Sequence, residues 1–436
     1  MKNEYWPRLV DSTLENKLEG VGAVLIEGPK WCGKTTTGEE HSNSTLMVKG
    51  KPSIRRITGL IDLESTAFLD GAPPMLVDEW QNVPDLWDVI RCEVDERNEP
   101  GQFILTGSAC PPLGETVHSG AGRFASFRMR TMTLFESRES NGSVSLRSLF
   151  DGCRVDCMAD LTTEGLVSAI VRGGWPGRVC GGTGKAYTAA DYLEMIASKD
   201  MSKYLYRSLV DDDDEDDDAS GVYRQNVYDV TSRLLQSIAR NLGTSASVAS
   251  IESDVNSKKE LVSTPTLNKY IATLERMYII ENLEAWNPHI RSRTRLAKTP
   301  KWHFSDPSLA AAALKLNEKK LLNDLNALGF FFESLCLRDI RVYLDSIGGR
   351  VSYIANNNGY EVDLILELDD GRWAAIEVKL GSLEYDKAAD NLLKLKDFVD
   401  TKRVGEPVFL AILTGMPDGY TRKDGVHVVP IGCLRD

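Results

Sequence analysis

The sequence has few histidines and no paired cysteines, and these absences narrow the kinds of site that it can build. Its 436 residues include 5 histidines and 8 cysteines. The cysteines are scattered and lack the paired C-x₂-C spacing that structural zinc sites favour. Cys153 and Cys157, with three residues between them, are the nearest pair. We therefore expect reduced thiols, and a metal site at this pair is the less favoured alternative.

Long apolar runs are also missing. No stretch approaches the roughly 18 uninterrupted apolar residues of a membrane helix, and the opening MKNEYWPRLV lacks the apolar segment of an export signal. Hydrophobic residues make up 42% and charged residues 26% of the chain, which is ordinary for a globular protein, and the length indicates two or three domains. We expect a cytoplasmic protein with no membrane partner.

Acidic residues exceed basic ones, but the excess is concentrated in one place. The formal charge is −13, and the run DDDDEDDD at residues 211–218 supplies eight of these negative charges and leaves −5 for the rest. The remainder does not exclude local basic surfaces. Adjacent carboxylates repel one another, so we predict that residues 210–222 are a disordered insertion. The alternative is an acidic segment that mimics phosphates and occupies a basic groove.

A glycine-rich motif near the amino end predicts a nucleotide site. Residues 28–35 read GPKWCGKT, which matches G-x-x-x-x-G-K-[ST] directly after an apolar run at 21–26. The glycines let backbone N–H groups face phosphate oxygens, Lys34 reaches the outer phosphates, and the hydroxyl of Thr35 ligates Mg²⁺. A helix starting at Lys34 would direct its positive end at the anion. The predicted cofactors are ATP and Mg²⁺, held by Gly28, Pro29, Lys30, Trp31, Cys32, Gly33, Lys34, Thr35 and Thr36.

Two further apolar strands end in residues that suit the same chemistry. Residues 75–81 read MLVDEWQ, in which Asp78 would join the Mg²⁺ shell and Glu79 would polarise the attacking water. Residues 102–109 read QFILTGSA, and Thr106 or Ser108 would sense the terminal phosphate. An ordinary core strand explains this second run equally well. Arg123, in the loop GAGRF, would act as an arginine finger on a neighbouring subunit's nucleotide, which predicts a homo-oligomer.

The residues after the acidic run predict helices followed by a strand. Apolar residues recur at helical spacing in 224–241, a short segment SVASIESDV follows, and 264–277 form a second amphipathic helix with Ser263 or Thr264 as its cap. An apolar strand is expected at 278–286. This is the order of a winged helix-turn-helix in which 264–277 would be the recognition helix.

Basic side chains support nucleic acid as a partner of this module. Lys269 and Arg276 lie on the expected exposed side of the helix, and a cluster that could bind phosphates follows it. That cluster consists of Arg291, Arg293, Arg295, Lys298 and Lys301. Helical spacing reports packing rather than DNA contact, so a purely protein-binding module is an equal alternative.

The last third carries a second group of chemically useful residues. Two strands at 361–368 and 372–380 are joined by a short turn, so that Asp363, Glu377 and Lys379 can converge at one sheet edge. An acid followed by acid-x-lysine is the arrangement of restriction-type nucleases, where Asp363 and Glu377 would hold Mg²⁺ and Lys379 would orient or deprotonate water. Glu333 would complete the site from a preceding helix. A half-exposed hairpin with outward charges is the alternative.

These motifs resemble a family of archaeal and bacterial AAA-like P-loop ATPases whose C-terminal domain of formerly unknown function resembles restriction-endonuclease-like folds. The resemblance rests on EYWPRLVD, LIEGPKWCGKT, MLVDEWQNVPDLWD, ILTGSA, GAGRF, GGWPG, FFFES, NNNGYEVD and IEVKLG. It implies an α/β chain divided into an ATPase domain (1–150), a helical connection with the acidic insertion 211–218 (151–223), a winged-helix module (224–300) and a nuclease-like domain (301–436).

The expected function is an ATPase that couples its nucleotide state to engagement of nucleic acid, with DNA favoured, and to Mg²⁺-dependent cleavage. The alternative is a nucleotide-dependent scaffold or regulator that binds DNA or a protein and cuts nothing.

Overall fold

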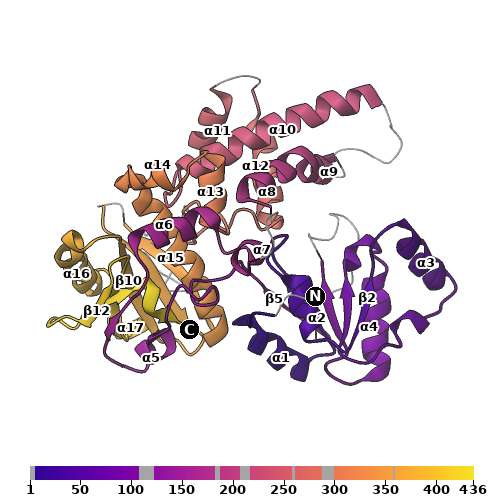
Figure 1. The fold of residues 1–436 in the computed structure, drawn as a ribbon, viewed down its shortest axis with the longest axis horizontal. Coiled ribbons are helices and arrows are strands. Elements are labelled where there is room, and N and C mark those ends of the chain that lie inside the picture. The colour runs from indigo at the N-terminus through magenta and orange to yellow at the C-terminus, as the bar shows by residue number, and fades with distance from the viewer. Residues whose placement is uncertain are drawn as a thin grey trace. The chain divides into compact units, whose positions relative to one another are not determined.

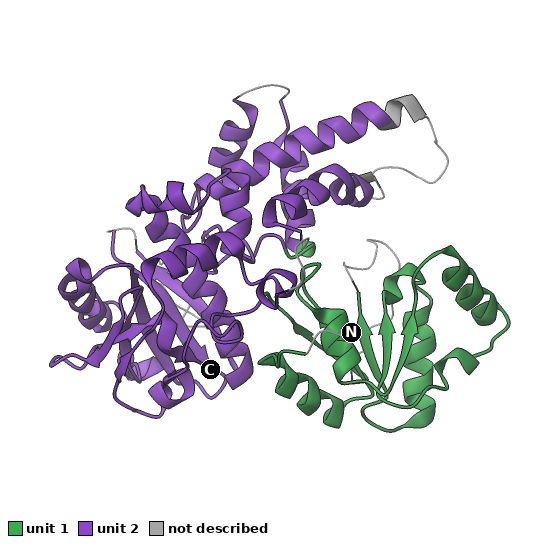
Figure 2. Cartoon of the chain, in the orientation of Figure 1, with its two compact units in different colours: residues 1–131, 207–210, 276–278 green, residues 132–206, 211–275, 279–436 purple. Residues whose placement is uncertain are grey.

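The chain folds into two compact units. Unit 1 comprises residues 1–131, 207–210 and 276–278, and unit 2 comprises 132–206, 211–275 and 279–436 (Figure 2). The units divide at residue 131, whereas the sequence suggested a boundary near 150. The computed structural model describes residues 5–107, 122–181, 187–206, 217–257, 261–286, 299–356 and 359–436. Within these ranges, no helix is both long and apolar enough to cross a membrane.

Unit 1 contains a parallel sheet, which makes it an α/β fold. The strands lie in the order β2-β3-β4-β1-β5 (Figure 1). All paired neighbours run parallel, so their carboxyl ends meet at one edge of the sheet. The strands are β1 (Ala23–Glu27), β2 (Ser44–Met47), β3 (Met75–Asp78), β4 (Phe103–Thr106) and β5 (Phe124–Arg128).

Both faces of this sheet are buried, as expected for parallel strands covered by helices on each side. Alternate residues of β4 enter different cores: Phe103 packs in one hydrophobic cluster and Ile104 in the other. The helices are α1 (Val10–Gly20), α2 (Lys34–Glu40), α3 (Lys51–Asp62) and α4 (Leu86–Arg97), with 3₁₀ turns η1 (Ala67–Leu69) and η2 (Trp80–Asn82).

Unit 2 is built on a mixed sheet that includes a strand from far upstream. Its order is β7-β12-β13-β11-β10-β9-β8. Strand β7 pairs antiparallel with β12 although some 260 residues separate them, and β6 pairs in parallel with β14 in a separate two-stranded sheet. Residues near 144–158 therefore belong to the C-terminal fold. The strands are β6 (Val144–Ser145), β7 (Asp156–Met158), β8 (Gly349–Ala355), β9 (Glu361–Leu368), β10 (Trp373–Lys379), β11 (Leu410–Thr414), β12 (Asp418–Thr421), β13 (His427–Pro430) and β14 (Leu434–Arg435).

Some helices of unit 2 pack on this sheet, and others pack on one another. Helix α15 packs against β8, β9 and β10, while α16 packs against β10 and β11. The helices are α5 (Leu146–Phe150), α6 (Thr163–Arg172), α7 (Pro176–Val179), α8 (Ala189–Met195), α9 (Met201–Tyr206), α10 (Asp217–Arg240), α11 (Val248–Asn256), α12 (Thr264–Arg276), α13 (Pro307–Ala313), α14 (Glu318–Leu322), α15 (Leu325–Ile347), α16 (Tyr385–Leu393) and α17 (Thr401–Val404). Short turns are η3 (Ile196–Asp200, a π-helix), η4 (Ser382–Glu384), η5 (Lys394–Asp397) and η6 (Ile431–Cys433).

Two expectations for the middle of the chain need correction. Helix α10 begins at Asp217, so the end of the predicted disordered insertion is helical. Residues 207–216 lie outside the described ranges. The strand expected at 278–286 is reduced to isolated bridges, which join Ile280 to Phe304, Leu283 to Lys301 and Ala285 to Tyr353. Tyr278 has a φ of 58°, which no extended strand allows.

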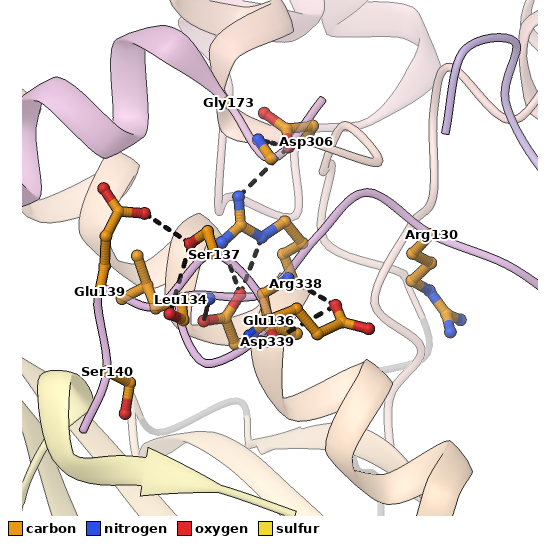
Figure 3. A network of polar contacts seen from close by, with 12 residues as sticks. Arg130, Leu134, Glu136, Ser137, Glu139, Ser140, Gly173, Asp306, Arg338 and Asp339 are labelled. Atoms are coloured by element: carbon orange, nitrogen blue, oxygen red, sulfur yellow. Dashed lines mark hydrogen bonds and ion pairs between the residues drawn. The ribbon is translucent and has the colours of Figure 1, made fainter. Parts of the chain in front are cut away.

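A buried ion network ties α15 to two upstream segments of unit 2. Figure 3 shows the guanidinium of Arg338 between the carboxylates of Asp306 and Asp339. The Asp339 carboxylate also accepts a hydrogen bond from the backbone N–H of Leu134 at 2.9 Å, and that of Asp306 accepts one from Gly174 at 3.0 Å. Burial raises the pKa of Asp339 to about 6, although Arg338 opposes the shift.

The same network explains the first glycine of the motif GGWPG. Gly173 has a φ of +73°, and a Cβ there would lie 2.4 Å from the hydroxyl of Ser308 and 2.7 Å from the Asp306 carboxylate. Any other residue would displace the network, so glycine is required for close approach.

We expect Arg338→Met to destabilise unit 2 by about 3–5 kcal/mol, because it leaves two buried carboxylates without their cation. Arg350→Met is the matched control: the pair that Arg350 forms with Glu367 is exposed at the arginine, and its loss should cost less than about 1 kcal/mol. Urea unfolding followed by circular dichroism measures both, and equal losses in the two variants would contradict a structural role for the network.

Candidate functional site

The phosphate-binding loop lies between the end of β1 and the start of α2, as the sequence predicted. Two glycines make its path possible. A Cβ on Gly28 would come within 2.1 Å of the carbonyl oxygen of Met129, and Gly33 has a φ of 108°. Helix α2 starts at Lys34, so its amino end follows the loop directly.

The polar residues of the motif form hydrogen bonds within the loop and with the end of the neighbouring strand β3. The Nζ of Lys34, which is buried, donates to the carbonyls of Gly28 at 2.8 Å and Pro29 at 2.7 Å. The hydroxyl of Thr35 donates to Asp78 at 2.9 Å, and Thr106 donates to the same carboxylate oxygen. A hydroxyl and a carboxylate are the hard oxygen ligands that Mg²⁺ prefers, so Thr35 and Asp78 fit the predicted metal.

Glu79 lies beside this group in an unusual conformation. It has a φ of 58°, its backbone N–H donates to Thr106, and its carboxylate accepts a hydrogen bond from Gln81. A non-glycine residue with positive φ is uncommon and often marks a functional position. No sequence signal indicated that Gln81 contacts Glu79.

The remaining predicted nucleotide residues differ in exposure. Cys32 is fully buried and Trp31 is 39% exposed with a φ of 66°. Lys30 is half-buried and Thr36 is exposed on α2.

Arg123 is not brought to the phosphate-binding loop of its own chain. Its backbone carbonyl accepts a hydrogen bond from Ala23, at the amino end of β1, whereas the loop follows the carboxyl end. Its guanidinium pairs with Asp95, and this hydrogen bond lowers the pKa of Asp95. A role at a nucleotide therefore requires a second subunit. Ser108 lies outside the described residues.

The second predicted site is assembled in unit 2. Strands β9 and β10 are antiparallel, and the Nζ of Lys379 lies 3.2 Å from Asp363 and 2.7 Å from Glu377. The backbone N–H of Val378 donates to Asp363 at 2.8 Å. The predicted convergence of these three side chains is present in the structure.

A second lysine, which the sequence assigned elsewhere, belongs to this cluster. Lys301 was expected to bind phosphates, but its side chain is 4% exposed and pairs with Glu333 at 3.3 Å and with Glu361. That interpretation is wrong because the ammonium is enclosed by carboxylates. The other basic candidates, Arg291, Arg293, Arg295 and Lys298, lie outside the described residues.

Asn391 of α16 is a further polar member that no sequence signal identified. Its side-chain amide donates to Glu377 at 2.7 Å and to the backbone carbonyl of Glu361 at 2.6 Å. The amide fixes the orientation of the Glu377 carboxylate.

Two of the three glutamates in the carboxylate–lysine cluster (Lys301, Glu333, Glu361, Asp363, Glu377 and Lys379) hold protons more tightly than usual. Burial, reinforced by the charge of Asp363, raises the pKa of Glu333 and of Glu377 to about 7. Burial also opposes ionisation of Asp363, but Lys379 and Lys301 outweigh it and hold its pKa below the ordinary value.

The fit of this cluster to a metal is partial. Asp363 and Glu377 offer two carboxylates around one point, now bridged by Lys379. Among the described residues, no group of three or more His, Cys, Asp or Glu side chains is placed to hold a metal. Two carboxylates can bind Mg²⁺ when water and substrate phosphate supply the remaining ligands.

Comparisons with known proteins divide the chain in a similar way. Residues 21–137 match the family described as AAA domain. Residues 163–320 and 328–434 match two families described as domains of unknown function, DUF8612 and DUF4143. Uncharacterised proteins of Mycobacterium tuberculosis and Mycobacterium bovis are each 24% identical over 374 residues, covering 84% of this chain and 72% of theirs.

Two solved structures show weaker likeness. A Walker-type ATPase of Pyrococcus abyssi aligns with 72% of this chain and 97% of its own at 13% identity and a TM-score of 0.40. A DNA polymerase III gamma subunit-related protein of Thermotoga maritima aligns with 61% and 99% at 13% identity and a TM-score of 0.24. The AAA match and the loop geometry support nucleotide binding and hydrolysis by unit 1.

We expect the stability of unit 2 to fall as pH rises through about 7. The pKa values of Glu333 and Glu377 are about 7, above the ordinary 4.5. The folded state therefore binds more protons than the unfolded state in this window, and its extra stability is complete below about pH 4.5 and lost above about pH 7. Glu377→Gln cannot ionise at this position. The loss of unfolding free energy with rising pH should therefore be smaller in this variant, by on the order of 1–3 kcal/mol.

Urea unfolding with a chelator present, from about pH 5 to about pH 8, measures this dependence. Glu384→Gln, at an exposed position, is the control. A pH slope in Glu377→Gln equal to that of the wild type would contradict the assignment.

Proposed function

We propose that this protein is an ATPase that couples its nucleotide state to DNA engagement and to Mg²⁺-dependent DNA cleavage by unit 2. The observation that carries the proposal is the convergence of Asp363, Glu377 and Lys379, with the lysine within 3.2 Å of both acids. Two acids and a lysine in this arrangement suit hydrolysis of a phosphodiester.

The cluster suggests a role for each side chain. Asp363 and Glu377 would hold Mg²⁺, which when bound neutralises charge that develops on the scissile phosphate. Burial alone would lower the pKa of Lys379, but Asp363 and Glu377 raise it above its ordinary value. Lys379 therefore stays charged, so it would orient the attacking water rather than remove its proton.

We assign DNA engagement to helices α10, α11 and α12 of unit 2. Helices α10, α11 and α12 are followed by the paired bridges near 280–283 and 301–304, which is consistent with a winged helix-turn-helix. Lys269 on α12 is exposed. The proposal includes a homo-oligomer in which Arg123 reaches a neighbouring nucleotide, because it lies at the wrong sheet edge to reach its own.

The alternative is a nucleotide-dependent scaffold that binds DNA or a protein and cuts nothing. One observation favours it: Lys301 and Lys379 each already pair with two carboxylates of the cluster. Buried ion pairs can be purely structural.

We expect Lys34→Ala to abolish ATP binding, because the ammonium that would contact the outer phosphates is removed. Arg123→Ala should bind ATP normally but hydrolyse it at least about 1,000-fold more slowly. Mixing the two variants should restore part of the ATP turnover. The intact loop of an Arg123→Ala subunit can then be reached by the intact Arg123 of a Lys34→Ala subunit. Phosphate release and calorimetry measure the two properties, and unchanged hydrolysis by Arg123→Ala would remove the finger and the argument for an oligomer.

Cleavage is tested with linear, circular and single-stranded DNA, with Mg²⁺ and with ATP, ADP or no nucleotide. Wild-type protein should nick or cut at least one substrate, and Asp363→Ala should lose essentially all activity because the metal loses a ligand. Glu367→Ala, a glutamate on the same strand that pairs with Arg350, should remain active. DNA binding without cleavage under every condition would leave the scaffold, and cleavage by Asp363→Ala would point to a contaminant.

A further inference from the structure

The segment that precedes α1 packs against the nucleotide site. The hydroxyl of Tyr5 donates to Asp11 at 2.7 Å and lies 3.1 Å from the hydroxyl of Thr37, which is on α2. The same Asp11 carboxylate accepts the backbone N–H of Arg8 at 2.8 Å. Asp11 thus holds the segment in one conformation beside the helix that follows the phosphate-binding loop.

Within this segment, the side chain of Arg8 reaches the loop itself. Arg8 is only 6% exposed. Its guanidinium donates to the carbonyl of Cys32 at 2.9 Å and to the carbonyl of Arg130 at 2.9 Å. Cys32 lies inside the motif, and Arg130 lies just beyond the end of β5.

The bond to Cys32 bears directly on phosphate binding because of peptide geometry. The carbonyl of Cys32 and the N–H of Gly33 belong to one planar peptide unit. In a trans peptide these two groups point in opposite directions. A guanidinium that holds the carbonyl on the protein side therefore directs the N–H of Gly33 to the other side, where the loop amides would surround phosphate oxygens.

The bond to Arg130 places Arg8 at a junction of two chain segments. Two other contacts join the loop to the end of β5: the thiol of Cys32 donates to the carbonyl of Met129 at 3.5 Å, and Gly28 lies so close to that carbonyl that a Cβ could not fit. Arg8 adds the charged contact to this set. Hydrogen bonds that involve a charged group are about twice as strong as neutral ones.

We propose that Arg8 is a positioning residue for nucleotide binding, which acts by fixing the Cys32–Gly33 peptide of the phosphate-binding loop. It touches no nucleotide; it determines where a loop amide points. This proposal rests on nucleotide binding by unit 1 and is independent of DNA cleavage.

The test compares Arg8→Met and Arg8→Lys with the wild type in the full-length protein. Calorimetry with Mg-ADP and Mg-ATP as probes should show binding weakened by about tenfold to a hundredfold in Arg8→Met, the effect of one lost hydrogen bond to a charged group. Arg8→Lys, whose ammonium can reach one carbonyl, should bind with intermediate affinity. The KM for ATP should rise in both variants more than kcat falls.

Arg97→Met separates positioning from simple stabilisation. Arg97 also belongs to unit 1 and donates to the backbone carbonyl of Leu69 at 2.9 Å and to Glu93 at 3.1 Å, but it contacts no part of the loop. It should lower the melting temperature without changing nucleotide affinity.

An Arg8→Met protein that also melts earlier yet binds nucleotide as tightly as the wild type would overturn the proposal. If Arg8→Met does not fold, Arg8→Lys decides: wild-type affinity in that variant counts against positioning, and weakened affinity at unchanged melting temperature supports it. Absence of nucleotide binding in the wild type would instead refute the assignment of unit 1.

Discussion

Charge that is taken out of water must be compensated where it is buried, and this constraint shapes both units. In unit 1, Arg8 and Lys34 are buried and each donates to two backbone carbonyls. In unit 2, Arg338 lies between two aspartates, and Lys301 and Lys379 lie among carboxylates. An uncompensated ion in such places would cost several kcal/mol, so each buried charge fixes the position of its partners.

Helix α15 joins two of these arrangements in unit 2. It carries Glu333, which faces the carboxylate–lysine cluster, and Arg338 and Asp339, which hold the backbone near residues 134 and 174. Six residues of α-helix span about 9 Å. Because the helix is rigid over this distance, the position of Glu333 depends on the same contacts that fix the segment leaving unit 1 along the chain.

Short sequence motifs and the spacing of apolar residues predicted the parts of the structure that depend on residues close together in the chain. Helix α2 starts at Lys34, β3 ends at Asp78, and the alternation along β9 and β10 brings Asp363, Glu377 and Lys379 together. The pairing of Lys301 with Glu333 and Glu361 had no such signal, because it joins three elements separated by tens of residues. The pairing of β7 with β12 was hidden for the same reason. The contact between Arg8 and Cys32 depends on a loop fold that no periodicity encodes.

The charge balance of the carboxylate–lysine cluster bears on whether the cluster is a functional site or a purely structural group of ion pairs. Glu333, Glu361, Asp363 and Glu377 face two ammonium groups, which leaves a formal charge of −2 when all are ionised. A support built only for stability would be expected to balance its charges, since a surplus carboxylate destabilises the fold. Here the surplus is relieved by protons, because the pKa values of Glu333 and Glu377 are raised to about 7. One divalent cation would supply the two positive charges that the ionised cluster lacks, and this is the charge that the proposed Mg²⁺ would bring.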